Sequence, residues 1–270
     1  MRTIIFAILF VTFIPNLYSQ NFTWIKIGNG IQYSYVENKK GNNIFIAIGG
    51  WQARQEWVNS WSLELYKSKL YELGVKHIFS VKGPDEVCNR NKEINIKTLA
   101  DYVKNIIYAT YYIDRVIVAA HSSGSFVANE LLDILYGEKG IAKDSFYVNK
   151  VYYFNLDGGI GSEDCGMALS DSVVKYLAKV YAVAVYDSVT EMYSSNYEVM
   201  KKLSEMYREK SELVLLDVSG SGCTDKWCLH DAAVNRKPYN PSKYDLEKDY
   251  TLFNDEHKVQ TDYLDVLKRK

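Results

Sequence analysis

Short apolar runs alternate along the chain with segments in which apolar residues recur every three or four positions. The apolar runs predict buried strands at residues 43–48, 75–81, 115–120, 150–156, 179–186 and 212–218. Between the first two runs, Trp57, Trp61 and Leu65 recur at helical spacing, and similar faces follow the later strands. Strands that alternate with helices form a parallel sheet covered on both sides, so the pattern predicts a three-layer α/β sandwich with a mostly parallel central sheet.

The two ends of the chain depart from this alternation. Arg2 precedes an apolar run from Ile4 to Phe10 that is too short to span a bilayer, and this order is typical of a secretory signal peptide. We expect residues 1–19 to be removed, with cleavage after Ser19, and residues 20–270 to form one domain. Its C-terminal extension, residues 238–270, should end in a helix over residues 256–268. The protein is then secreted or periplasmic.

Composition narrows the partners that the protein can have. The chain is 47% hydrophobic, enough for a sizeable core, and its 32 basic and 33 acidic residues give a net charge of −1. Because basic residues are not in excess, we expect no positively charged surface that would bind nucleic acid. No segment after the N-terminal run is long and apolar enough to cross a membrane, so we expect no integral membrane association.

Four cysteines in an exported chain predict one or two disulfides. Cys223 and Cys228 are the best candidates, because they lie five residues apart in a glycine- and serine-rich segment that one bond would close. The alternative for a cysteine pair is a zinc site. A second cysteine or histidine cluster with metal-ligand spacing does not accompany this pair, so we expect no metal and no organic cofactor.

Ser122 is the central chemical feature of the sequence. It follows the predicted strand 115–120 and precedes a helical segment, in the sequence Ala120-His121-Ser122-Ser123-Gly124. A serine hydroxyl becomes a nucleophile when a sharp strand-to-helix turn holds it exposed beside a base. The small residues at positions 120 and 124 let strand and helix approach closely, although alanine stands where the usual G-x-S-x-G pattern has its first glycine. The alternative is a turn that binds phosphate at a helix N-terminus.

This elbow resembles that of the α/β-hydrolase superfamily, particularly lipases and esterases, and the order of elements is similar from Asn43 to about His230. The resemblance implies the chain order serine, acid, histidine. His230, after the last strand and on a loop at the carboxyl edge of the sheet, is the expected base, with His257 as its rival. For the acid there are two candidates, Asp187 at the commoner position and Asp157 one strand earlier.

The resemblance also implies donors for an oxyanion. Ser123 supplies one backbone N–H, and the loop after strand 43–48 supplies the other from Gly50 or Trp51. The function implied is that of a secreted serine hydrolase that cleaves a carboxylic ester, whether a small molecule or linked to a polymer. A peptidase, thioesterase or acyltransferase on the same triad, and a non-catalytic binding protein of this fold, are the alternatives.

Overall fold

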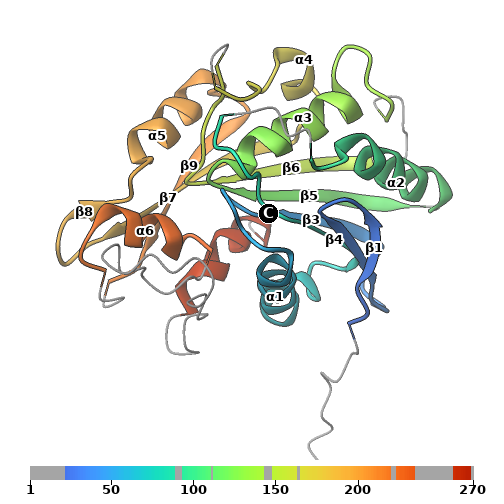
Figure 1. Ribbon diagram of the computed structural model, residues 1–270, viewed down its shortest axis with the longest axis horizontal. Coiled ribbons are helices and arrows are strands. Elements are labelled where there is room, and N and C mark those ends of the chain that lie inside the picture. The colour runs from blue at the N-terminus through green and yellow to red at the C-terminus, as the bar shows by residue number, and fades with distance from the viewer. Residues whose placement is uncertain are drawn as a thin grey trace, which may run out of the picture.

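The computed structural model describes residues 22–88, 93–110, 112–142, 148–162, 165–219, 223–234 and 258–268. The expected signal peptide and the rival base His257 lie outside these residues. Figure 1 shows a twisted sheet crossing the middle of the molecule, with helices above and below it. In the part of the chain described here, no helix has the length and apolarity needed to cross a bilayer.

The sheet has nine described strands in the order β1-β2-β4-β3-β5-β6-β7-β8, with β9 also paired to β7. Five pairings, which link β4, β3, β5, β6, β7 and β9, are parallel, whereas β1–β2, β2–β4 and β7–β8 are antiparallel. The sheet is therefore mostly parallel, as predicted. The strands are β1 (Ile25–Gly28), β2 (Ile31–Tyr35), β3 (Asn43–Ile48), β4 (Val75–Val81), β5 (Ile113–His121), β6 (Val148–Leu156), β7 (Lys179–Asp187), β8 (Met192–Tyr193) and β9 (Ser211–Asp217).

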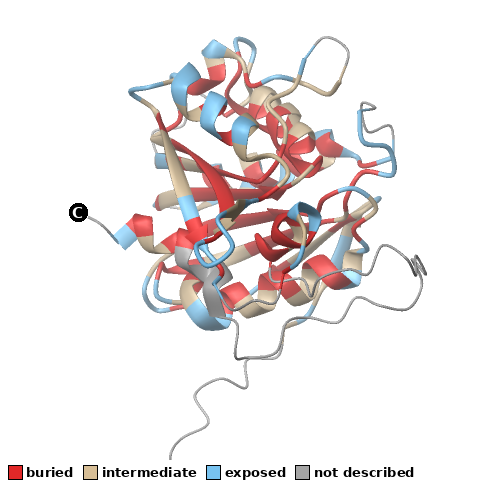
Figure 2. Cartoon of the chain, turned by 90° about the vertical axis from the view of Figure 1, so that its left-hand side faces the viewer, coloured by how far each residue is buried: buried red, intermediate tan, exposed pale blue. Residues whose placement is uncertain are grey.

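Helices cover both faces of this sheet, and each face has its own hydrophobic core. Alternate residues of a strand point to opposite faces, and in β3 the side chains of Ile44, Ile46 and Ile48 enter one core while Phe45 and Ala47 enter the other. The helices that cover the first core are α2 (Ile96–Ala109), α3 (Gly124–Tyr136), α4 (Asp171–Val174) and α5 (Tyr197–Met206). Those that cover the second core are α1 (Gln55–Leu65), its π-helical continuation η1 (Tyr66–Leu70), α6 (Lys226–Ala232) and the 3-10 helix η3 (Lys258–Lys268). Figure 2 shows the buried strands between helices whose outer faces are exposed.

All six predicted strands are present, with ends that differ from the prediction by no more than two residues. The sequence pattern did not reveal β1, β2, β8, α4 or α6, which are short and carry mixed polar and apolar residues. One prediction of local structure was wrong: His230, expected on a loop, lies in α6. Asp225 explains why a helix begins there, because its carboxylate accepts hydrogen bonds from the backbone N–H groups of Trp227 and Cys228, each at 2.9 Å.

Candidate active site

Ser122 occupies a strained turn between β5 and α3. Its φ of +53° is in the left-handed region, which costs a residue with a side chain about 1–2 kcal/mol. Two backbone hydrogen bonds hold the turn: the N–H of Ser122 donates to the carbonyl of Leu156 at 3.1 Å, and its carbonyl accepts from the N–H of Ser125 at 3.1 Å. The side chain is half-buried. The sequence thus forms the predicted elbow, with a hydroxyl that is accessible to solvent.

The close packing around this elbow explains its small residues. A Cβ on Gly124 would lie 2.3 Å from the carbonyl oxygen of Gly49, a clash with backbone that cannot be relieved by moving a side chain. Ala120, which replaces the usual glycine, is fully buried between β3 and β6, where its register partners are Ile48 and Asn155. A methyl group therefore fits at the first position of the pattern but not at the last.

His230 and Asp157 form a buried pair. Nδ1 of His230 lies 2.7 Å from Oδ2 of Asp157, and the side chains are only 7% and 0% exposed. Because a carboxylate can only accept, the imidazole donates from Nδ1, which leaves the lone pair on Nε2. An imidazole in this tautomer can take a proton from a neighbouring hydroxyl.

Further contacts fix Asp157 at the end of β6. Its other carboxylate oxygen, Oδ1, accepts from the hydroxyl of Ser194 at 2.6 Å, and its backbone carbonyl accepts from the amide group of Asn196 at 2.7 Å. The backbone of Asp157 is itself left-handed, with φ +47°. A buried carboxylate with both oxygens engaged, held by strained backbone, is arranged to orient the imidazole.

Of the two aspartates expected as the acid, Asp187 stands at the commoner position, but Asp157 makes the hydrogen bond to His230. Asp187 is also buried at the end of its strand, β7, but its Oδ1 accepts from the backbone N–H groups of Val189 and Thr190 at 2.8 and 3.4 Å. Within the described residues it makes no hydrogen bond to a histidine. Asp217 is exposed and bonded to Ser219 and Ser188, which lower its carboxyl pKa to about 2. Among these three carboxylates, Asp157 is the one that contacts His230.

His121, the residue before the candidate nucleophile, links the elbow to His230. Its Nε2 lies 3.0 Å from the backbone carbonyl of His230, and the two ring centroids are 4.6 Å apart. Since a carbonyl accepts, Nε2 of His121 carries the proton. His230 is thus held at its side chain by Asp157 and at its backbone by the neighbour of Ser122. No pattern in the sequence indicated this second contact.

The loop after β3 lies against Ser122. A Cβ on Gly50 would be 2.9 Å from both Cβ of Ser122 and Nδ1 of His121, so only glycine permits this approach. The backbone N–H groups of Gly50, Trp51 and Ser123 donate no hydrogen bond to any residue that the structure describes. Of the three amides expected from the sequence, that of Ser123 follows Ser122 in the chain and those of Gly50 and Trp51 are in the loop that lies against it, and none of them donates a hydrogen bond within the described part.

Two disulfides brace the surrounding loops. Cys223–Cys228, the predicted bond, joins the segment before α6 to the first turn of that helix, two residues before His230. Cys88–Cys165, which the sequence did not reveal because 77 residues separate the two cysteines, ties the loop after β4 to the loop after β6. Those two strands flank β3 and β5, so the second bond connects the loops on either side of the elbow.

One group of potential metal ligands occurs among the described residues. His121, His230 and Asp231 each have a ligand atom within 4.8 Å of the others. Both histidines use a ring nitrogen for a hydrogen bond, His230 to Asp157 and His121 to the carbonyl of His230. These two buried hydrogen bonds account for the positions of the rings without an ion.

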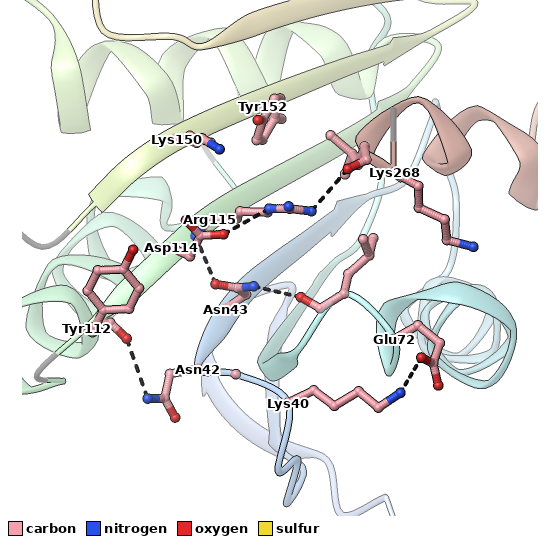
Figure 3. Close-up of a pocket in the computed structure, with 13 residues that line it drawn as sticks. Lys40, Asn42, Asn43, Glu72, Tyr112, Asp114, Arg115, Lys150, Tyr152 and Lys268 are labelled. Atoms are coloured by element: carbon pink, nitrogen blue, oxygen red, sulfur yellow. Dashed lines mark hydrogen bonds and ion pairs between the residues drawn. The ribbon is translucent and has the colours of Figure 1, made fainter. Parts of the chain in front are cut away.

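A separate pocket of about 810 Å³ lies at the opposite, amino edge of the sheet. Figure 3 shows two ion pairs among its lining residues, Lys40 with Glu72 and Arg115 with Asp114. The amide of Asn43 lies in its floor and bonds to backbone on both sides. None of the candidate catalytic residues lines this pocket.

Some solved structures are similar to this chain at low sequence identity. No protein-family model matches the chain, and no curated protein is similar to it in sequence. Among solved structures, an esterase of Pyrococcus furiosus is similar with a TM-score of 0.45 and 11% identity, covering 74% of this chain and 83% of that one. A carboxyl esterase of the fungus Tuber melanosporum gives 0.47 and 6%, covering 80% and 84%, and a dienelactone hydrolase of Anabaena variabilis gives 0.40 and 11%, covering 80% and 94%.

All of these scores are below 0.5. The sheet order, the helices on both faces and the strand-turn-helix elbow at Ser122 are properties of the chain itself. Together they make the fold a three-layer, α/β-hydrolase-like sandwich with a mostly parallel central sheet, as the sequence predicted.

Proposed function

We propose that this protein is a serine hydrolase that cleaves carboxylic esters through an acyl-enzyme, with Ser122 as nucleophile, His230 as base and Asp157 as the acid. The observation that carries the proposal is the buried His230–Asp157 pair, whose histidine backbone is bonded to the residue before a strained, accessible serine. In a binding protein that does no chemistry, this strain would have no compensating use.

In the proposed reaction, Oγ of Ser122 attacks the ester carbonyl while Nε2 of His230 takes its proton. Asp157 stabilises the imidazolium that forms, and the backbone N–H groups of Ser123 and of Gly50 or Trp51 stabilise the oxyanion. His230 then gives the proton to the leaving alkoxide. In the second half of the reaction, His230 takes a proton from the water that attacks the acyl group and gives it to Oγ of Ser122. No metal or organic cofactor takes part.

The two disulfides support export of the protein. Such bonds form and persist in oxidising compartments, which include the periplasm and the extracellular space. The proposed ester substrates are therefore ones that the protein meets outside the cytoplasm. A signal peptide over residues 1–19 remains a prediction from the sequence.

Labelling with a fluorophosphonate tests the proposal directly, because the reagent reacts with activated serines. We expect one labelled residue, Ser122, identified by peptide mapping. Ser122→Ala should lose the label and the hydrolysis of p-nitrophenyl acetate, while the free energy of unfolding changes by less than about 1 kcal/mol, because a half-buried hydroxyl adds little to folding.

Ser68→Ala is a matched control, since Ser68 is exposed and its hydroxyl bonds to backbone carbonyls of its own helix. It should keep both the label and the activity. Equal labelling of wild type and Ser122→Ala would remove Ser122 as the nucleophile.

A further inference from the structure

Two tryptophans are exposed beside the candidate active site. Trp51 is 43% exposed and Trp227 is 67% exposed, whereas Trp57 and Trp61 are buried in the core. An indole in water leaves a large apolar area unburied, and exposed tryptophans are enriched at binding surfaces for that reason. The positions of these two rings therefore help to indicate which class of ligand binds at the candidate active site.

Each tryptophan lies next to a candidate catalytic residue. Trp227 precedes His230 by one turn of α6, and its ring meets the imidazole edge to face, with centroids 5.6 Å apart. Trp51 follows Gly50, which packs directly against Ser122. Trp51 is in the loop after β3, while α6, which carries Trp227, packs against β7 and β8, so the two tryptophans belong to segments on opposite sides of β5 in the sheet order.

The ring of Trp51 is held in place before any ligand binds. Its indole N–H donates to the backbone carbonyl of Asp85 at 2.9 Å. The loop that contains Asp85 is in turn tied to the loop after β6 by the Cys88–Cys165 disulfide and by a hydrogen bond from the N–H of Gly166 to the carbonyl of Cys88. An aromatic ring fixed in this way loses little entropy when it binds a ligand.

The surroundings of the two rings are polar. Gln52 and the exposed Asp85 lie beside Trp51, and Asp225 and Lys226 precede Trp227. Aromatic faces within a polar rim match a sugar ring, which has apolar C–H faces and hydroxyl groups around its edge. An alkyl chain would instead require a continuous aliphatic wall. Val87 and Val189 are also exposed in loops at this edge, so a lipid surface is the competing occupant that a test has to include.

We propose that Trp51 and Trp227 bind the sugar ring of an O-acylated carbohydrate and so present its ester carbonyl to Ser122. This inference rests on the proposed function. The reaction adds water across the ester bond: the sugar oxygen leaves with the proton that His230 took from Ser122, and the acyl carbon keeps the oxygen of water as a carboxylic acid.

The first experiment compares acetate esters that differ only in the alcohol: a mono-O-acetylated methyl glucoside, ethyl acetate, and dodecyl acetate in detergent micelles. Acid release is followed in a pH-stat. In Trp227→Ala, the ratio of kcat/KM for the sugar ester to kcat/KM for ethyl acetate should fall about tenfold, mainly through KM, as expected for one lost ring contact.

Tyr108→Ala is the matched control, because Tyr108 is a similarly exposed aromatic residue, 47%, on the outer side of α2. It should leave the ratio unchanged. An equal loss for the sugar ester and ethyl acetate in Trp227→Ala overturns the inference. So does a selective loss for dodecyl acetate, which would assign the tryptophans to a lipid surface instead.

A binding measurement separates this inference from the proposed function. The Ser122→Ala variant is titrated with the acetylated glucoside by calorimetry, with and without Trp227→Ala. Binding that the second substitution weakens supports the inference even if the wild-type protein hydrolyses no ester, in which case only the proposed function fails. Hydrolysis of ethyl acetate together with no measurable binding of the glucoside overturns the inference and leaves the proposed function standing.

Discussion

The carboxyl and amino edges of the same sheet differ in how much strain they contain. Four non-glycine residues among those described have a left-handed backbone, namely Gln52, Ser122, Asp157 and Glu191, and they follow β3, β5, β6 and β7 at the carboxyl edge. At the amino edge, the turn before β4 uses Gly74, for which a φ of +71° is not strained. Among the described residues, non-glycine residues with a left-handed backbone therefore occur only at the carboxyl edge, where this backbone positions side chains such as those of Ser122 and Asp157.

The two edges also differ in their polar groups. At the carboxyl edge the amides of Gly50, Trp51 and Ser123 donate to no described residue. At the amino edge the side chain of Asn43 bonds to the carbonyl of Leu73 and the N–H of Arg115, at 2.6 and 2.8 Å. Uncommitted donors are useful only if a ligand or transition state engages them, whereas satisfied groups stabilise the fold. We therefore interpret the pocket at the amino edge as a part of the molecule whose polar groups stabilise the fold.

The largest effect that this comparison predicts is the loss of kcat when Asp157, the proposed acid of the triad, is replaced. Asp157→Asn should keep the shape of the site but favour the wrong tautomer of His230, lowering kcat for p-nitrophenyl acetate by up to about 10⁴-fold. Asp187→Asn is the matched control, because Asp187 is equally buried at the end of a strand but bonds to the turn that follows it. It should keep most of the activity.

Steady-state kinetics with both variants distinguish the two acids. If Asp187→Asn loses kcat while Asp157→Asn retains it, the hydrogen bond seen at His230 is not the one used in catalysis. If both remain active and His230→Ala is active as well, the base is His257 or Ser122 does not work through a triad.

A smaller effect is expected from adding one methyl group at each edge. Gly50→Ala places a Cβ 2.9 Å from Ser122 and His121, so the loop must move and one oxyanion donor is lost, which lowers kcat by about 10²–10³-fold. Gly41→Ala at the amino edge also meets backbone closely, with a Cβ 3.0 Å from the carbonyl oxygen of Gly74. Its cost should appear in thermal stability and not in kcat.

Measuring kcat and the melting temperature for both glycine variants tests the division of roles directly. A Gly41→Ala protein that melts at the wild-type temperature but has lost activity would show that the amino edge is functional. A fully active Gly50→Ala protein would remove this loop from the oxyanion site.

The sequence was sufficient for the six longer strands and for the strand-turn-helix elbow at Ser122, because both depend on local patterns. A buried parallel strand needs a continuous apolar run, and an elbow needs small residues two places before and after the serine, as Ala120 and Gly124 show. The short strands β1, β2 and β8 lack such runs. They form because neighbouring strands offer them hydrogen bonds, which is a property of the assembled sheet.

The choice of acid could not be made from the sequence for a related reason. Asp157 and Asp187 are both buried at the ends of adjacent strands, and only the position of α6 in space brings His230 to the first of them. The Cys88–Cys165 bond and the placement of Trp51 and Trp227 likewise depend on contacts between loops far apart in the chain. The sequence pattern therefore did not predict how the loops are arranged around Ser122.

The smallest predicted effect is a loss of stability without a loss of activity, from Asn43→Ala at the amino edge. The substitution leaves the N–H of Arg115 and the carbonyl of Leu73 without their side-chain partner, which should lower the free energy of unfolding by about 1–3 kcal/mol. Lys40→Ala, which breaks an exposed ion pair with Glu72 in the same pocket, should cost only about 0–1 kcal/mol. Urea unfolding measures both differences, and p-nitrophenyl acetate hydrolysis should be unchanged in both variants below the unfolding transition. A fall in kcat for folded Asn43→Ala would show that the two edges are coupled, because none of the candidate catalytic residues contacts the Asn43 side chain in the described part of the chain.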